Sequence, residues 1–121
     1  MSKHNELGLK GEILALEFLE KKGFTILEIN WRFSHIEVDI IAKQRNTLVF
    51  VEVKTRFGDQ FGFPEEAVDI PKQKNLAKAA EEYLEQKNLD MDVRFDVISI
   101  NFKNQPPKIY YIQDAFFPYE M

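Results

Sequence analysis

Three charged residues, Asp39, Glu52 and Lys54, lie within the most apolar segments of the chain. The segments 38–42 and 48–54 are rich in β-branched and aromatic residues, which is typical of buried strands. Because side chains alternate across a strand, Glu52 and Lys54 share one face. Charges in such surroundings are costly to desolvate unless a divalent metal ion or a phosphate compensates them.

These residue types suit the hydrolysis of a phosphodiester, which needs an activated water and neutralisation of the charge that builds up on the phosphate. A short turn at 44–47 separates the two segments and predicts an antiparallel hairpin, so that Asp39 and Glu52 lie on neighbouring strands. Converging carboxylates bind Mg²⁺ or Mn²⁺, and Lys54 beside them can orient the water. The alternative is an ion pair of Glu52 and Lys54 on an exposed strand face, which contributes little.

The pattern of apolar residues predicts helices and strands in the order α-β-β-β-α-β-β. Helices are predicted at 6–22 and 71–87, and strands at 24–29, 36–42, 48–54, 93–100 and 108–112. Residues 30–34 are interpreted as a connection between the first two strands. This order predicts an α/β fold, in which helices pack on a mixed sheet, in a single domain that spans residues 1–121.

The composition excludes several kinds of site. There is no cysteine for a disulfide or a thiolate zinc site, and His4 and His35 are too isolated for a histidine zinc site. No apolar run approaches the length of a membrane span and the first residues do not resemble a signal peptide, so we expect a cytoplasmic protein without a membrane partner. The net charge of −4 argues against non-specific coating of nucleic acid, but not against a nuclease, whose active site is itself acidic.

Two further features each allow two interpretations. Lys72, Lys74 and Lys78 recur at helical spacing, either as a phosphate-facing surface or as an ordinary solvated one. The segment 55–64 is irregular and contains three Phe, which either fold back as a lid on the core or stack on nucleic acid bases.

At Asp39 and Glu52-Val53-Lys54 the chain resembles the PD-(D/E)-x-K signature of the restriction-endonuclease-like superfamily. Over most of its length it is similar to the YraN-like family of small bacterial proteins. The resemblance implies a restriction-endonuclease-like mixed β-sheet flanked by helices, similar to that of archaeal Holliday-junction resolvases. The matching segments include Gly11-Glu12, Asn30-Trp31-Arg32, Glu37–Ala42, Leu48–Arg56, Gly62 with Pro64, Lys72 and Arg94–Val97.

The resemblance also implies roles for individual residues. Asp39 and Glu52 would hold Mg²⁺ or Mn²⁺, the carbonyl of Val53 would be a third ligand, and Glu12 could complete the shell. Lys54 would assist the attacking water. For Glu12 the alternative is an ordinary solvent-facing helix residue. DNA is a more fitting partner than RNA, and self-association as a homodimer, as in the resolvases, would enlarge the DNA-binding surface.

Two neighbours of Asp39 need separate interpretation. Glu37 lies on the same face two residues earlier, and we interpret it as a partner of Arg32 or His35, with a metal ligand as the alternative. The family usually has glycine where this chain has Ile36. A β-branched residue there restricts the close approach of a substrate at that corner.

Three hypotheses for function follow. The first is a Mg²⁺- or Mn²⁺-dependent endonuclease that hydrolyses phosphodiester bonds in DNA, in branched or single-stranded structures. The second is a non-catalytic nucleic-acid-binding module with a nuclease-like fold. The third is an adaptor that contacts another protein through aromatic residues, namely Phe57, Phe61, Phe63, Phe116 and Phe117.

Overall fold

The structure is a computed structural model that describes residues 6–58, 68–103 and 105–116. Two helices and five strands follow one another in the predicted order. They are α1 (Glu6–Lys21), β1 (Thr25–Phe33), β2 (Ile36–Gln44), β3 (Thr47–Arg56), α2 (Ile70–Lys87), β4 (Asp92–Asn101) and β5 (Lys108–Ile112). The expectation of an α/β fold with a mixed sheet is confirmed.

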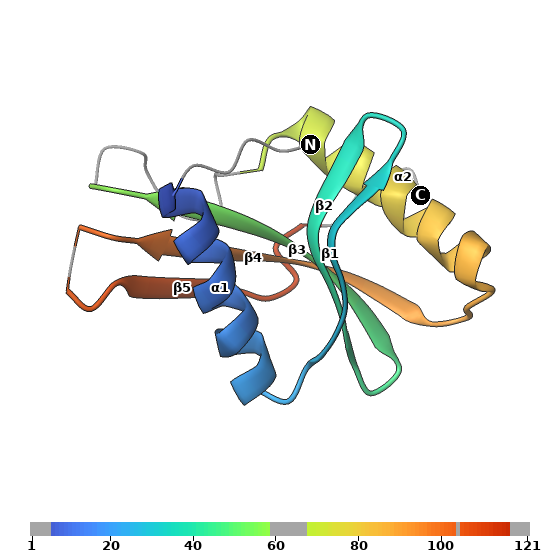
Figure 1. Cartoon of the computed structure of the whole chain (residues 1–121). Coiled ribbons are helices and arrows are strands. Elements are labelled where there is room, and N and C mark those ends of the chain that lie inside the picture. Colours follow the sequence, from blue (N-terminus) through green and yellow to red (C-terminus); the bar gives the residue numbers. More distant parts are fainter. Residues whose placement is uncertain (1–5, 59–67, 104, 117–121) are drawn as a thin grey trace.

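The five strands form one sheet in the order β1-β2-β3-β4-β5. Neighbours run antiparallel except β3 and β4, which are parallel and are therefore joined by a crossover that contains α2. The helices α1 and α2 lie on opposite sides of the sheet (Figure 1). One buried cluster contains Ala15 and Leu19 of α1, and the other contains Leu76 and Tyr83 of α2, so each face of the sheet has its own core.

The first strand is longer than predicted, and the interpretation of residues 30–34 as a connection is wrong. Trp31, Arg32 and Phe33 continue β1 and pair with β2. Asn30 has a positive φ of 52°, which asparagine tolerates better than most residues, and the strand continues beyond it. The Trp31 ring packs edge-on against Tyr83 at 5.3 Å, and this burial against α2 keeps the segment on the sheet.

Helix α1 approaches β3 closely at Gly11. A Cβ atom at this position would lie 2.0 Å from Cγ2 of Thr55, so only glycine allows this contact. Thr55 directly follows Lys54, and Glu12 directly follows Gly11. The packing of the helix therefore fixes where Glu12 meets the sheet, and Glu12 is only 6% exposed there.

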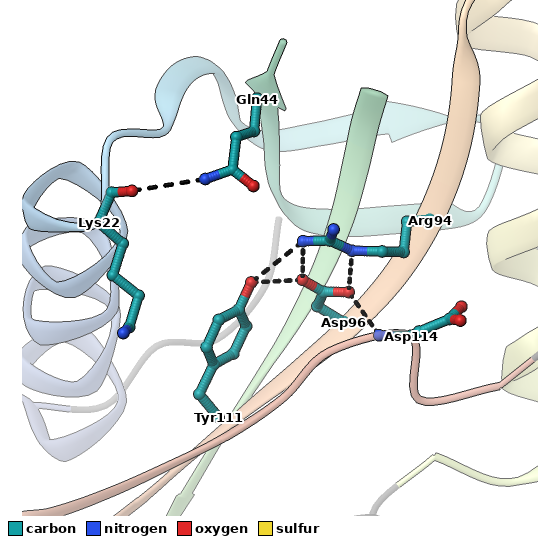
Figure 2. Close-up of polar contacts among 6 residues, drawn as sticks. All are labelled: Lys22, Gln44, Arg94, Asp96, Tyr111 and Asp114. Atoms are coloured by element: carbon teal, nitrogen blue, oxygen red, sulfur yellow. Dashed lines mark hydrogen bonds and ion pairs between the residues drawn. The ribbon is translucent and has the colours of Figure 1, made fainter. Parts of the chain in front are cut away.

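A buried carboxylate, Asp96, joins β4 to β5 and to the segment after β5 (Figure 2). It accepts two hydrogen bonds from the Arg94 guanidinium, both of 3.0 Å, one from the Tyr111 hydroxyl and one of 2.9 Å from the Asp114 backbone N–H. Burial and the hydrogen bond to Asp96 raise the pKa of Tyr111 to about 12. Every group in this network has a partner, so we assign it a structural role.

Tyr111→Phe should lower the free energy of unfolding by about 1–2 kcal/mol, because it removes one hydrogen bond to a buried charge. Tyr110→Phe is the matched control, since Tyr110 is the neighbouring tyrosine on β5 and is 42% exposed. Urea denaturation of both variants measures the difference. Equal stability of the two variants would contradict the structural role of the network.

Candidate active site

The strands β2 and β3 stop pairing at the point where two candidate residues lie. Their register runs from Gln44 opposite Thr47 to Ile40 opposite Val51. Asp39 and Glu52 are the next residue on each strand, while β3 continues to pair with β4 as far as Arg56. Figure 1 shows β2 turning away from β3 beyond this point. Both carboxylates therefore lie at a fork in the sheet.

The Asp39 carboxylate is held at this fork by the backbone of β3. Its Oδ2 accepts a hydrogen bond of 2.8 Å from the N–H of Val53. Burial, the negative charge of Glu52 and, more weakly, that of Glu12 raise the pKa of Asp39 from 3.8 to about 7, against the opposing effects of the Val53 N–H and Lys72. Burial is the largest of these causes, because a desolvated carboxyl group is more stable in its neutral form, and the neighbouring carboxylate of Glu52 adds to the shift.

Glu52 is buried, with 4% exposure, so the alternative of an ion pair on an exposed face is wrong for this carboxylate. Its Oε2 lies 3.0 Å from Nζ of Lys72 and 3.7 Å from Nζ of Lys54. The prediction that Glu52 and Lys54 share a face is confirmed. Oε1 of Glu52 is buried and has no hydrogen-bond partner in the described part of the chain. A buried, unpaired carboxylate oxygen is costly, and a bound cation would satisfy it.

Glu12 approaches the fork from α1, with Asn30 next to it. Because Ile29 pairs with Ile40 and Trp31 with Val38, Asn30 stands opposite Asp39. Its Nδ2 donates to Oε1 of Glu12 at 3.5 Å. The alternative of a solvent-facing Glu12 is wrong, and its charge acts on Asp39.

Lys72 reaches the fork from the first turn of α2. Asp69 caps this helix by accepting a hydrogen bond of 3.0 Å from the Lys72 N–H, which fixes where the helix begins. Burial lowers the pKa of Lys72, but Glu52 and Asp39 outweigh this effect and the pKa is raised overall. Of the three lysines at helical spacing, Lys72 faces the site, whereas Lys74 and Lys78 are exposed. Helical spacing alone could not distinguish them.

A pocket of about 190 Å³ opens between α2 and the beginning of β2. Glu37 lines it and forms an ion pair of 3.7 Å with Arg32, which confirms Arg32 as its partner. Ile36 lines it as well and is 5% exposed, because its side chain packs into the core on the α2 side. The full lining consists of His35, Ile36, Glu37, Asp39, Lys72, Asn75 and Leu76.

The donor set of the fork fits a small, hard cation. Within residues 6–58, 68–103 and 105–116, no group of three or more His, Asp or Glu side chains converges as a ready metal site. Asp39 and Glu52 with the Val53 carbonyl offer oxygen ligands only, and Mg²⁺ is commonly bound through one or two carboxylates while it keeps several waters. The unpaired Oε1 of Glu52 is the structural observation that supports this fit.

Of the five aromatic residues in the adaptor hypothesis, two lie in the described part of the chain. Phe57 is 64% exposed, whereas the Phe116 ring stacks on Phe95 at 5.1 Å. Phe61, Phe63 and Phe117 lie outside the described residues, as does most of the segment interpreted as a lid or a stacking loop. None of the helices among the described residues has the length and apolar character that crossing a membrane requires.

Comparison with known proteins finds one matching family model and several similar bacterial proteins. The family model described as "Uncharacterised protein family UPF0102" matches residues 11–100. The chain is 50% identical over 117 residues to a UPF0102 protein of Christiangramia forsetii, covering 97% of this chain and 98% of that protein. It is 49% identical over 118 residues to one of Geobacter metallireducens, covering 96% and 97%. It is 47% identical over 118 residues to one of Bacteroides thetaiotaomicron, covering 98% of each.

Proposed function

The chain belongs to the family described as "Uncharacterised protein family UPF0102", and we infer its function from the site. We propose that it is a Mg²⁺- or Mn²⁺-dependent nuclease that hydrolyses phosphodiester bonds in DNA. The observation that carries the proposal is the buried carboxylate of Glu52 at the fork of β2 and β3, with one oxygen unpaired and the other beside two lysines. A protein that only binds nucleic acid would not need buried carboxylates close to the phosphates of its ligand. The mixed sheet and the fork also support the resemblance to the restriction-endonuclease-like superfamily.

Asp39 and Glu52 would hold the cation. Oδ2 of Asp39 accepts a hydrogen bond from the Val53 N–H, so Oδ1 would bind the ion. On Glu52, the unpaired Oε1 would be the ligand. The Val53 carbonyl would be a third ligand. Glu12 would act from α1 through its charge, which raises the pKa of Asp39 and would add to the attraction of a cation. When bound, Mg²⁺ or Mn²⁺ lowers the pKa of a coordinated water and polarises the phosphate oxygens.

Lys54 and Asp39 have further tasks in the reaction. The Lys54 side chain is 37% exposed, so its ammonium group can meet solvent and substrate at the edge of the fork. There it orients the attacking water and stabilises the charge that develops on the phosphate. Asp39 has a pKa of about 7 and would have to be ionised to hold a cation, so cation binding should strengthen as the pH rises through about 7.

The test is cleavage of labelled junction, flap, single-stranded and duplex DNA in the presence of Mn²⁺ or EDTA. We expect products with Mn²⁺ only, preferentially from branched or single-stranded substrates, and none from Glu52→Gln. This variant keeps the shape of the side chain but removes the charge that holds the cation. A matched RNA substrate measures the preference for DNA. Cleavage in EDTA, or equal cleavage by Glu52→Gln, would contradict the proposal, and metal-dependent binding without products would favour the non-catalytic binding module.

A further inference from the structure

Two lysines, from different elements, share one oxygen of Glu52. Lys72 is the nearer, at 3.0 Å from Oε2, and Lys54 lies at 3.7 Å. Lys54 follows Glu52 on the same strand, whereas Lys72 comes from the capped first turn of α2. The closer ion pair of the buried carboxylate is therefore made by a residue outside the Glu-x-Lys segment.

Lys72 also faces the pocket between α2 and β2. Its side chain is 41% exposed, so its ammonium group reaches Glu52 while part of the side chain stays accessible to a ligand. Ile36 and Leu76 provide an apolar wall and Asn75 a polar amide. The pocket of about 190 Å³ has room for several waters, which a phosphate group and its ester oxygens can displace.

Charge decides when Lys72 can bind a phosphate. Without a cation, Lys72 is the nearest positive charge to Glu52, and the pocket also presents the carboxylates of Glu37 and Asp39. An anionic ligand is then disfavoured. A divalent cation held by Glu52 would offset the negative charge that attracts Lys72, and the ammonium group could then pair with another anion in the pocket.

We propose that this pocket receives a phosphodiester group of the nucleic acid, and that Lys72 binds that group only while a divalent cation is held by Glu52. The inference rests on the proposed function, because it uses the same cation site. Lys72 then has a role separate from that of Lys54, and the affinity for nucleic acid depends on the bound cation.

Binding of an uncleaved single-stranded DNA tests this coupling. Affinity is measured by fluorescence anisotropy in Ca²⁺ and in EDTA, with recovery of intact DNA checked on a gel. For Lys72→Met we expect affinity to fall about 5- to 10-fold in Ca²⁺ and the log–log salt slope to decrease by about 1, which corresponds to one lost phosphate contact. In EDTA the variant should bind like the wild type, because Lys72 is then paired with Glu52.

Two control variants separate this role from a general loss of charge or of structure. Lys74→Met removes an exposed lysine two residues further along α2 and should change affinity equally, by less than about twofold, in both buffers. Lys72→Arg should restore most of the Ca²⁺-dependent affinity. Calorimetry without DNA gives a second readout, since Lys72→Met should bind Mn²⁺ about 3- to 10-fold more tightly once the competing ammonium group is gone.

The outcomes also distinguish this inference from the nuclease proposal. Equal losses for Lys72→Met in Ca²⁺ and EDTA, or unchanged Mn²⁺ affinity, would overturn the role of Lys72 even if the wild type cleaves DNA. A Ca²⁺-dependent loss in a protein that yields no products would support Lys72 and overturn the nuclease. A wild type that binds neither Mn²⁺ nor Ca²⁺ would overturn both.

Discussion

Replacing Lys54 by methionine should reduce DNA cleavage by at least about 100-fold and leave Mn²⁺ binding in place. Methionine keeps most of the length of the side chain but loses the ammonium group. Removal of one group that stabilises charge in a transition state typically costs 10²- to 10³-fold in rate. Because Lys54 lies 3.7 Å from Oε2 of Glu52, its loss removes a competing positive charge and should not weaken the binding of the cation.

Cleavage rates under single-turnover conditions and calorimetric Mn²⁺ titration measure the two parts of this prediction. Lys43→Met is the matched control, because Lys43 is an exposed lysine on β2 that does not line the pocket. It should retain the wild-type rate within about twofold. Unchanged cleavage by Lys54→Met would show that the products come from a contaminating nuclease, and a parallel loss of Mn²⁺ binding would contradict a role for Lys54 in the chemical step.

Replacing Asp39 by asparagine should stabilise the metal-free protein at neutral and alkaline pH. The pKa of Asp39 is about 7 in the folded protein against 3.8 ordinarily, so its stabilising contribution is present below pH 4 and is lost as the pH rises to 7. The shift corresponds to at most about 4 kcal/mol. An amide oxygen can still accept the hydrogen bond from the Val53 N–H, so we expect a gain of about 1–3 kcal/mol at pH 8 that shrinks toward pH 4.

The same substitution should weaken Mn²⁺ binding by at least 10- to 100-fold, because it removes the charge of a direct ligand. Urea denaturation in EDTA from pH 4 to 8 gives the stability, and calorimetry gives the metal affinity. Asp92→Asn, at an exposed aspartate where β4 begins, should change neither quantity appreciably. A loss of stability at pH 8, or tight Mn²⁺ binding by Asp39→Asn, would contradict the assignment of this carboxylate.

The elements were predictable because each has a local signal. Apolar periodicity marked both helices, and the apolar runs around Asp39 and before Glu52 marked β2 and β3. The end of β1 was missed because Asn30 and the residues after it read as a turn, whereas the burial of Trp31 against Tyr83 continues the strand. That contact joins residues far apart in the sequence, and local patterns do not report it.

Part of the arrangement around Asp39 was predictable for similar reasons. The short turn between the two apolar segments placed Asp39 and Glu52 on neighbouring strands, and the alternation of side chains placed Lys54 on the same face as Glu52, whereas the end of the pairing between β2 and β3 at these residues has no local signal. The position of Lys72 depends on how α2 docks on the sheet, so its distance of 3.0 Å from Glu52 could not be read from helical spacing.

The Asp96 network was missed although a signal for it was present. Arg94 and Asp96 are oppositely charged residues two apart in an otherwise apolar strand, and such residues share one face. Their partners, Tyr111 and Asp114, come from beyond the turn after β4 and depend on the pairing of β5.

The location of a bound cation tests the central claim most directly. Crystals grown with Mn²⁺ and measured near the manganese absorption edge should give an anomalous difference peak between the carboxylates of Asp39 and Glu52, within about 2.5 Å of an oxygen of each. Occupied crystals with the peak elsewhere, or with none at the fork of β2 and β3, would contradict the claim that these two acids form a metal centre.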